Sequence, residues 1–264
     1  MSNLMKHRWF ELRYNSVLWL TLIICCAFAF IVTSMTGLSY LTDAPMVEGV
    51  SYNLQGFFSA MTADCIFPLL IIGGSFTAMM LGQQFSSRTI DQEISAGHSR
   101  VEIFASQCIV GFIVPNTAIL LAIFIGCLRW AGSIPMSSAG EAIPYFSRTL
   151  ILLSLLNFSL FSACIFFVVI FRDTAKTITV SALFLLVACW TMPALEQAAP
   201  QVHGTLYTIA PSLPLLLHPA FLMRYVLYST LTFSQGIWAV AVAIGWTILF
   251  LGGAYCVFRR CELK

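Results

Sequence analysis

Long apolar stretches separated by charged residues dominate the pattern of this chain. No charged residue falls between Arg13 and Asp43. Four more intervals of the chain contain no charged residue, and a sixth interval contains only Asp64. Each interval holds an apolar stretch of roughly 19–23 residues, and a helix of that length, rising ~1.5 Å per residue, crosses a hydrocarbon core of ~30 Å. The pattern predicts six transmembrane helices, over residues 17–36, 61–81, 108–128, 149–171, 177–195 and 237–258.

The basic residues predict which side of the membrane each loop occupies. With both termini in the cytoplasm, only Arg129, Arg148 and Arg224 of the 13 lysines and arginines lie outside. Because cytoplasmic loops carry an excess of basic residues, this asymmetry places both termini on the cytoplasmic side. The first apolar stretch has no small-residue cleavage site behind it, which favours a retained span over a signal peptide.

Composition narrows the class of protein. Hydrophobic residues make up 59% of the 264 residues and charged residues 9%, against about 25% charged residues in a typical soluble domain. Such a chain could not cover its apolar surface in water, which excludes a soluble enzyme, a secreted disulfide scaffold and a disordered chain. The net charge of +2, without a basic cluster outside the membrane flanks, argues against nucleic acid as a partner. Since no repeat or linker interrupts the chain, residues 1–264 are expected to form one membrane domain.

Residues that could carry chemistry are sparse. The nine cysteines lie mostly inside apolar runs, where they are typical packing residues, and the four histidines lie far apart, so no metal site is expected. An intramembrane enzyme needs a nucleophile with its base, or a metal cluster, inside the spans. The spans offer one carboxylate and no histidine. The chain is therefore expected to have no catalytic residue and no cofactor of its own.

The segment Met5–Tyr14 precedes the first span and mixes basic with apolar residues. Met5, Trp9 and Leu12 fall on one face of a helix, with basic side chains elsewhere around it. This pattern predicts a short amphipathic helix in the cytoplasmic interface, an elbow before the first span. A charged flank that only fixes the orientation is the alternative.

The cytoplasmic stretch Gln83–Gln107 indicates a helix, a sharp break and a second helix. Ile90 and Ile94 share a helical face, and Gly97 stands where a left-handed C-terminal cap is needed. Ser99 then begins a helix that continues into the third span, with Glu102 placed to close a capping box. The pattern alone fits both a well-capped connection and a docking surface.

The external connection from Glu196 to Gly236 is too apolar for a plain loop. Pro219 and Arg224 interrupt it, so it is also too broken for a seventh span. A pair of short re-entrant helices dipping into the outer leaflet fits both features, because irregular backbone at that depth must be covered by protein or line a cavity.

Two short runs, Arg88–Ile90 and Ile94–Arg100, resemble the stretch after the second span of type-2 ABC transporter permeases. In that family this stretch forms the coupling helix that docks on the ATP-hydrolysing subunit. Six spans, an N-terminal elbow helix and short re-entrant helices between the fifth and sixth spans are also similar to the family. In layout the resemblance covers essentially the whole chain.

The resemblance implies one half of a dimeric transmembrane domain that works with two ABC ATPase subunits. Because this chain has no G-x-x-x-x-G-K-[ST] run, ATP and Mg²⁺ would bind to those separate subunits. The second permease chain would be identical or homologous, and membrane lipid would surround the pair. The expected mechanism is alternating access, in which closure of the ATPases pushes the coupling helices.

Compact permeases of this kind resemble those that export, or confer immunity to, lantibiotics, bacteriocins and similar antibiotics. The expected substrate is therefore an amphipathic antimicrobial peptide or drug, and the expected location is the bacterial plasma membrane. An ABC permease for lipid or another small molecule is an alternative, as is an ATP-independent, ion-coupled transporter.

By the family's layout, seven residues are candidates for coupling to the ATPase: Arg88, Asp91, Glu93, Gly97, Ser99, Arg100 and Glu102. The alternative is a solvated loop whose charges matter only for topology. Asp64, within about one turn of the outer end of its span, is either a hydrated cap or a contact for a cationic substrate entering a central cavity.

Overall fold

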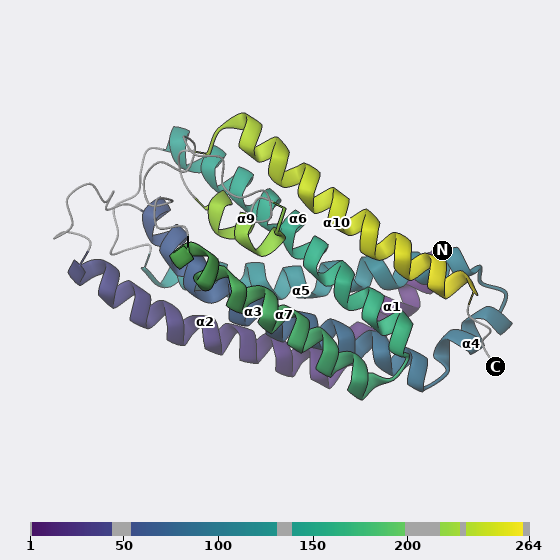
Figure 1. Cartoon of the computed structure of the whole chain (residues 1–264). Coiled ribbons are helices and arrows are strands. Elements are labelled where there is room, and N and C mark those ends of the chain that lie inside the picture. The colour runs from purple at the N-terminus through teal and green to yellow at the C-terminus, as the bar shows by residue number, and fades with distance from the viewer. Residues whose placement is uncertain (1, 44–53, 131–138, 199–216, 228–230, 261–264) are drawn as a thin grey trace.

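The computed structural model describes residues 2–43, 54–130, 139–198, 217–227 and 231–260 (Figure 1). The described residues form helices joined by short turns, without a strand. The helices are α1 (Ser2–Tyr14), α2 (Ser16–Asp43), α3 (Leu54–Ser86), α4 (Thr89–Ser95), α5 (Arg100–Trp130), α6 (Ala139–Phe171), α7 (Thr174–Ala198), α9 (Pro219–Val226) and α10 (Phe233–Arg260). The chain is therefore all-helical over the described residues, as the sequence predicts.

Among the described residues, five helices are long and apolar enough to cross a membrane: α2, α3, α5, α6 and α10. This finding supports a multi-pass membrane protein. Each of the six predicted spans lies inside one helix, including 177–195 inside α7. The apolar part of α7 that the structure describes, Thr174–Cys189, is shorter than the other five. Five candidate spans are thus shown, and the sixth span and the orientation stay predictions.

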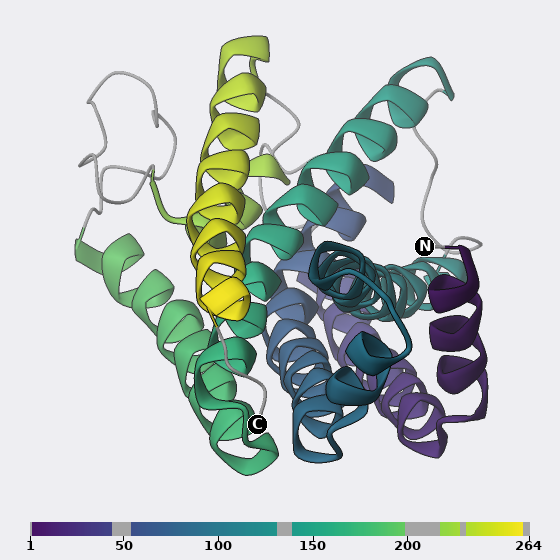
Figure 2. The same cartoon turned by 90° about the vertical axis from the view of Figure 1, so that its right-hand side faces the viewer.

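The long helices run side by side along one axis, and α1, α4 and the C-terminal end of α10 gather at one end (Figures 1 and 2). A small apolar cluster at that end joins Leu4 of α1, Ile90 of α4 and Phe258 of α10. This end contains the predicted coupling segment and is called the α4 end below.

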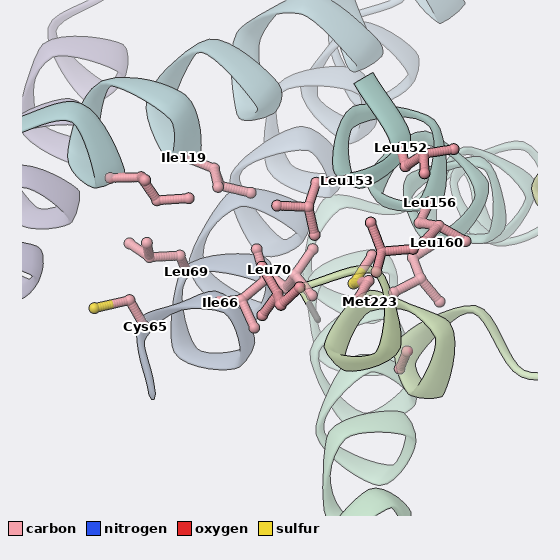
Figure 3. Close-up of a cluster of buried hydrophobic side chains, with 14 of the residues drawn as sticks. Cys65, Ile66, Leu69, Leu70, Ile119, Leu152, Leu153, Leu156, Leu160 and Met223 are labelled. Atoms are coloured by element: carbon pink, nitrogen blue, oxygen red, sulfur yellow. The ribbon is translucent and has the colours of Figure 1, made fainter. Parts of the chain in front are cut away.

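A larger core fills the bundle, with α3 packed against α2, α5, α6 and α7, and α6 packed against α10. Figure 3 shows part of this core, in which Leu70 of α3, Leu156 of α6 and Met223 of α9 lie close together. Close approach of α3 and α5 depends on Gly73, because a Cβ there would lie 3.2 Å from the Cβ of Pro115. The glycine therefore allows the two helices to pack closely.

The helix α9 lies in the connection for which the sequence predicts short re-entrant helices. The Trp246 Nε1 group donates to the carbonyl of Leu217 at 2.9 Å, and the Tyr145 hydroxyl donates to the carbonyl of Leu227 at 2.8 Å. These bonds fix both ends of α9 to the neighbouring α10 and α6. Residues 199–216 of the predicted re-entrant pair lie outside the described residues.

Candidate functional site

The connection between α3 and α5 contains α4 between two turns. Arg88, with φ 56°, occupies the first turn, and Gly97, with φ 89°, the second. The amide of Gly97 donates to the carbonyl of Ile94, and the amide of His98 donates to the carbonyl of Glu93. This is the Schellman arrangement, in which a glycine at positive φ closes a helix. The predicted left-handed cap at Gly97 is confirmed.

Ser99 and Glu102 cap the N-terminus of α5. The Ser99 amide donates to Glu102 Oε2 at 3.3 Å, and the Glu102 amide donates to Ser99 Oγ at the same distance. The two residues satisfy each other's backbone groups, which confirms the predicted capping box. Both ends of the α4–α5 turn are therefore defined by hydrogen bonds that the local sequence specifies.

One face of α4 is packed against the bundle. Ile90 is 1% exposed and Glu93 is 7% exposed, one turn apart, while Gln92, Ser95 and Ala96 on the other side are exposed. Burial of Ile90 in the cluster at the α4 end holds the helix on the protein by the hydrophobic effect. A helix this short does not persist alone in water, so this packing is what maintains it.

A buried ion pair joins α4 to α1. Nη2 of Arg8 lies 2.8 Å from Oε2 of Glu93, to which it donates, and 2.7 Å from Oε1. Nη1 of Arg8 donates to Oε2 of Glu11 at 3.2 Å. Arg8 is only 2% exposed. Because a buried cation is costly unless it is paired, the two carboxylates are what allow Arg8 to lie inside this contact.

Burial and the neighbouring charges determine the pKa of Glu93 in this pair. Removal from water raises the pKa of the Glu93 carboxyl above its usual value, and the charge of Arg8 acts in the opposite direction. The nearby charge of Glu11 raises the pKa further. The ionised form of Glu93 therefore depends on Arg8 remaining in place.

Arg100 also forms hydrogen bonds within the chain. Its Nη1 donates to the carbonyl of Arg259 at 2.9 Å and to that of Phe258 at 3.4 Å. These carbonyls belong to the last turn of α10, which the cation stabilises through its charge as well as its hydrogen bonds. The start of α5 and the end of α10 are thereby fastened together.

The predicted coupling residues therefore fall into three groups. Glu93 and Arg100 bind α1 and α10, while Gly97, Ser99 and Glu102 shape the turn. The third group is Arg88, which is exposed, and Asp91, which is half-exposed.

Sequence reasoning missed Arg8, and it assigned the apolar face of α1 differently. The residues of α1 packed against the protein are Leu4, Arg8 and Leu12, at i, i+4 and i+8, whereas Trp9 is 63% exposed. The spacing of Leu4 and Leu12 around Arg8 is the only local signal, and it does not identify Glu93 as the partner.

Asp64, the other sequence candidate, lies within α3, but its side chain falls outside the described residues. Deeper in the bundle, buried amides join neighbouring helices. Asn157 Nδ2 of α6 donates to Asn116 Oδ1 of α5 at 3.1 Å, and Gln107 Nε2 of α5 donates to Gln84 Oε1 of α3 at 3.3 Å. Such hydrogen bonds between apolar helices stabilise the packing of the bundle.

Comparison of the chain with models of known protein families and with curated protein sequences found no match. The geometry of the α4 end is therefore the main physical guide to function.

Proposed function

We propose that this chain is the permease subunit of an ATP-driven exporter of the type-2 ABC class, with α4 as its coupling helix. The observation that carries the proposal is the construction of α4. It is a short helix, closed by the Gly97 turn and the Ser99–Glu102 capping box, and fixed to α1 by the buried Arg8–Glu93 pair. A connection held so firmly can transmit a push without bending.

The route of such a push follows from the contacts. Through its two turns α4 continues into α3 and α5, and through Glu93 it is tied to α1. Arg100 at the start of α5 extends the connection to the end of α10. Force applied to the exposed side of α4 would therefore reach four other helices, which is what switching between two states of a packed bundle requires.

The remaining parts of the proposal come from the resemblance and the membrane pattern. The 25 residues of α7, at ~1.5 Å each, reach the ~30 Å of a hydrocarbon core and would supply the sixth span. A second permease chain would complete the pathway, and two ATPase subunits would bind ATP and Mg²⁺. The proposed cargo is an amphipathic antimicrobial peptide or drug, moved across a bacterial plasma membrane, with Asp64 as a candidate contact in the pathway.

The test is to extract the tagged chain gently from native membranes and to identify the proteins that co-purify. The proposal expects a soluble subunit with a Walker A motif in a fixed ratio to the permease. Arg88→Glu, on the outward side of the connection, should remove that subunit without loss of the permease. Lys176→Glu is the matched control, because it reverses an exposed basic residue near the start of α7.

Purification of the chain as a stable oligomer, with no ATPase even after crosslinking, would overturn the proposal. Ion-coupled transport would then be tested with Asp64→Asn in vesicles under an imposed proton gradient. A co-purifying ATPase that survives both Arg88→Glu and Asp91→Arg would reject α4 as the coupling helix while leaving the ABC class in place.

A further inference from the structure

A groove opens between α1, α2 and α5. Figure 2 shows α1 at the α4 end. The volume of the groove is about 420 Å³, within the ~300–1,000 Å³ typical of small-molecule sites. The lining is almost entirely apolar: Trp9 and Leu12 of α1, Leu18, Trp19 and Leu22 of α2, and Ile113 and Val114 of α5. Trp9 is 63% exposed and Trp19 54% exposed, so the groove opens to the surroundings of the protein.

The walls of the groove are fixed by hydrogen bonds at the junction of α1 and α2. Asn15 Oδ1 accepts from the amide of Val17 at 2.9 Å and so caps the start of α2. Trp19 Nε1 donates to the carbonyl of Arg13 at 2.9 Å. These bonds hold the last turn of α1 against the first turns of α2, which preforms the site.

The charge of Arg13 distinguishes this groove from an ordinary lipid-facing surface. Arg13 lines the groove and is exposed. Arg8, five residues earlier in α1, is paired with two carboxylates, but no carboxylate of the described residues forms an ion pair with Arg13. The groove therefore combines an apolar wall with an unneutralised cation, and its occupant should have a long apolar part and a negative group.

We propose that this groove binds a single anionic phospholipid of the cytoplasmic leaflet, with an acyl chain along the apolar wall and the phosphate against Arg13. The cytoplasmic leaflet carries the anionic lipids, and basic side chains beside a membrane attract them. Tryptophan side chains are favoured at headgroup depth, which is where Trp9 and Trp19 would place the mouth of the groove. The proposal depends on α1 lying at the membrane surface and does not depend on coupling to an ATPase.

Native mass spectrometry of the full chain, released from micelles with equal amounts of phosphatidylglycerol and phosphatidylcholine, tests this site. The wild-type chain should retain one phosphatidylglycerol in preference to phosphatidylcholine. Arg13→Gln should lower that preference about fivefold, the effect expected for one basic residue near a phosphate. Ile113→Trp, which fills the groove from a 40% exposed position, should abolish retention of both lipids.

Two controls keep the test specific. Arg260→Gln removes an exposed basic residue at the end of α10, and Ile248→Trp enlarges a 66% exposed side chain of α10. Neither should change lipid retention. If Ile113→Trp fails to fold, Thr117→Phe fills the same groove from a neighbouring exposed position of α5.

Equal lipid retention by the wild-type and filled variants would overturn the proposal and leave only a loose shell of lipid. Loss of a dimer in the filled variants, with lipid retention unchanged, would also overturn it, since a second copy of the chain would then cover the groove. Retention that is lost on filling but is equal for the two lipids would reject the role of Arg13.

Discussion

Two connections at the α4 end join neighbouring long helices in different ways. α6 ends at Phe171 and α7 begins at Thr174, so Arg172 and Asp173 make the whole turn. Between α3 and α5 the chain instead inserts α4 and two turns. The helices beside the two connections touch, because Ser86 Oγ at the end of α3 and Thr174 Oγ1 at the start of α7 lie 2.9 Å apart.

Their local chemistry is nevertheless similar. Each uses an arginine in the left-handed region, Arg88 at φ 56° and Arg172 at φ 51°. Each also uses a polar side chain to begin the next helix, since Asp173 Oδ1 accepts from the amide of Lys176 at 2.9 Å, as Ser99 does from that of Glu102. Two residues therefore suffice for a turn at this end, and α4 with its buried Glu93 is an addition that the connection itself does not need.

The largest expected effect comes from removing the cation that holds α4. Arg8→Ala leaves the buried Glu93 carboxylate without its partner, and breaking a buried pair in this way costs about 3–5 kcal/mol. The unfolding midpoint in detergent should fall, and limited proteolysis should cut the α3–α5 connection before the α6–α7 turn. Arg13→Ala, which removes an exposed arginine from the same helix, should have little effect on either measurement.

The double variant Arg8→Ala/Glu93→Ala separates the pair from other effects of the substitutions. It should lose clearly less stability than the sum of the two single variants, because no unpaired charge remains buried. Additive losses would mean that the two side chains act independently, and α4 would then be held by Ile90 alone.

Which interactions at the α4 end the sequence predicts depends on how far apart the two partners lie along the chain. The spans follow from the spacing of charges, and the Gly97 turn and the Ser99–Glu102 box follow from residues within one turn of each other. The structure contains the turn and the box, and five of the six predicted spans lie in helices long and apolar enough to cross a membrane.

The Arg8–Glu93 pair, by contrast, links residues 85 positions apart, and the bonds from Arg100 reach α10 over a separation of 159 positions. Charge and helical position leave their partners open, because nothing in the local pattern distinguishes Glu93 from Asp91 as the buried carboxylate. Only the packing of α1 and α10 beside α4 decides this. The same reason explains why Arg8 was absent from the candidate residues.

A second, smaller effect is expected at the Gly97 turn. Gly97→Ala places a Cβ on a residue at φ 89°, a conformation that costs a non-glycine residue roughly 1–2 kcal/mol. The space around the site is open, with no atom within 4 Å of the added Cβ, so the cost is conformational. The unfolding midpoint should therefore fall moderately.

Gly245→Ala is the matched control, since it too has no atom within 4 Å but lies inside α10. There the substitution should raise stability slightly, because alanine favours helix over glycine. Equal effects of the two substitutions would show that the left-handed backbone at residue 97 costs alanine no stability. The C-terminus of α4 could then be capped without a glycine.

The caps of the two connections provide a third test. Ser99→Ala and Asp173→Ala each remove a side-chain acceptor at a helix start, at a cost of about 1 kcal/mol. The two losses in unfolding midpoint should be similar. If α4 is the coupling helix, Ser99→Ala should also reduce ATP-driven transport in proteoliposomes containing the partner ATPase, whereas Asp173→Ala should not. Equal losses of transport would remove the functional distinction between the connections.

The smallest expected effect is a pH dependence of stability that arises from Glu93 in the α3–α5 connection. Burial raises the pKa of Glu93 above its usual value of 4.5, against the attraction of Arg8, so the folded state holds this proton more tightly than the unfolded state. The stability from this group is complete below about pH 4.5 and is lost as pH rises through the raised pKa. The unfolding midpoint of the wild-type chain, minus that of Glu93→Gln, should therefore decrease between pH 4 and pH 8. A difference that rises with pH would show that the attraction of Arg8 outweighs the burial of Glu93 and lowers the pKa of this carboxyl below its usual value.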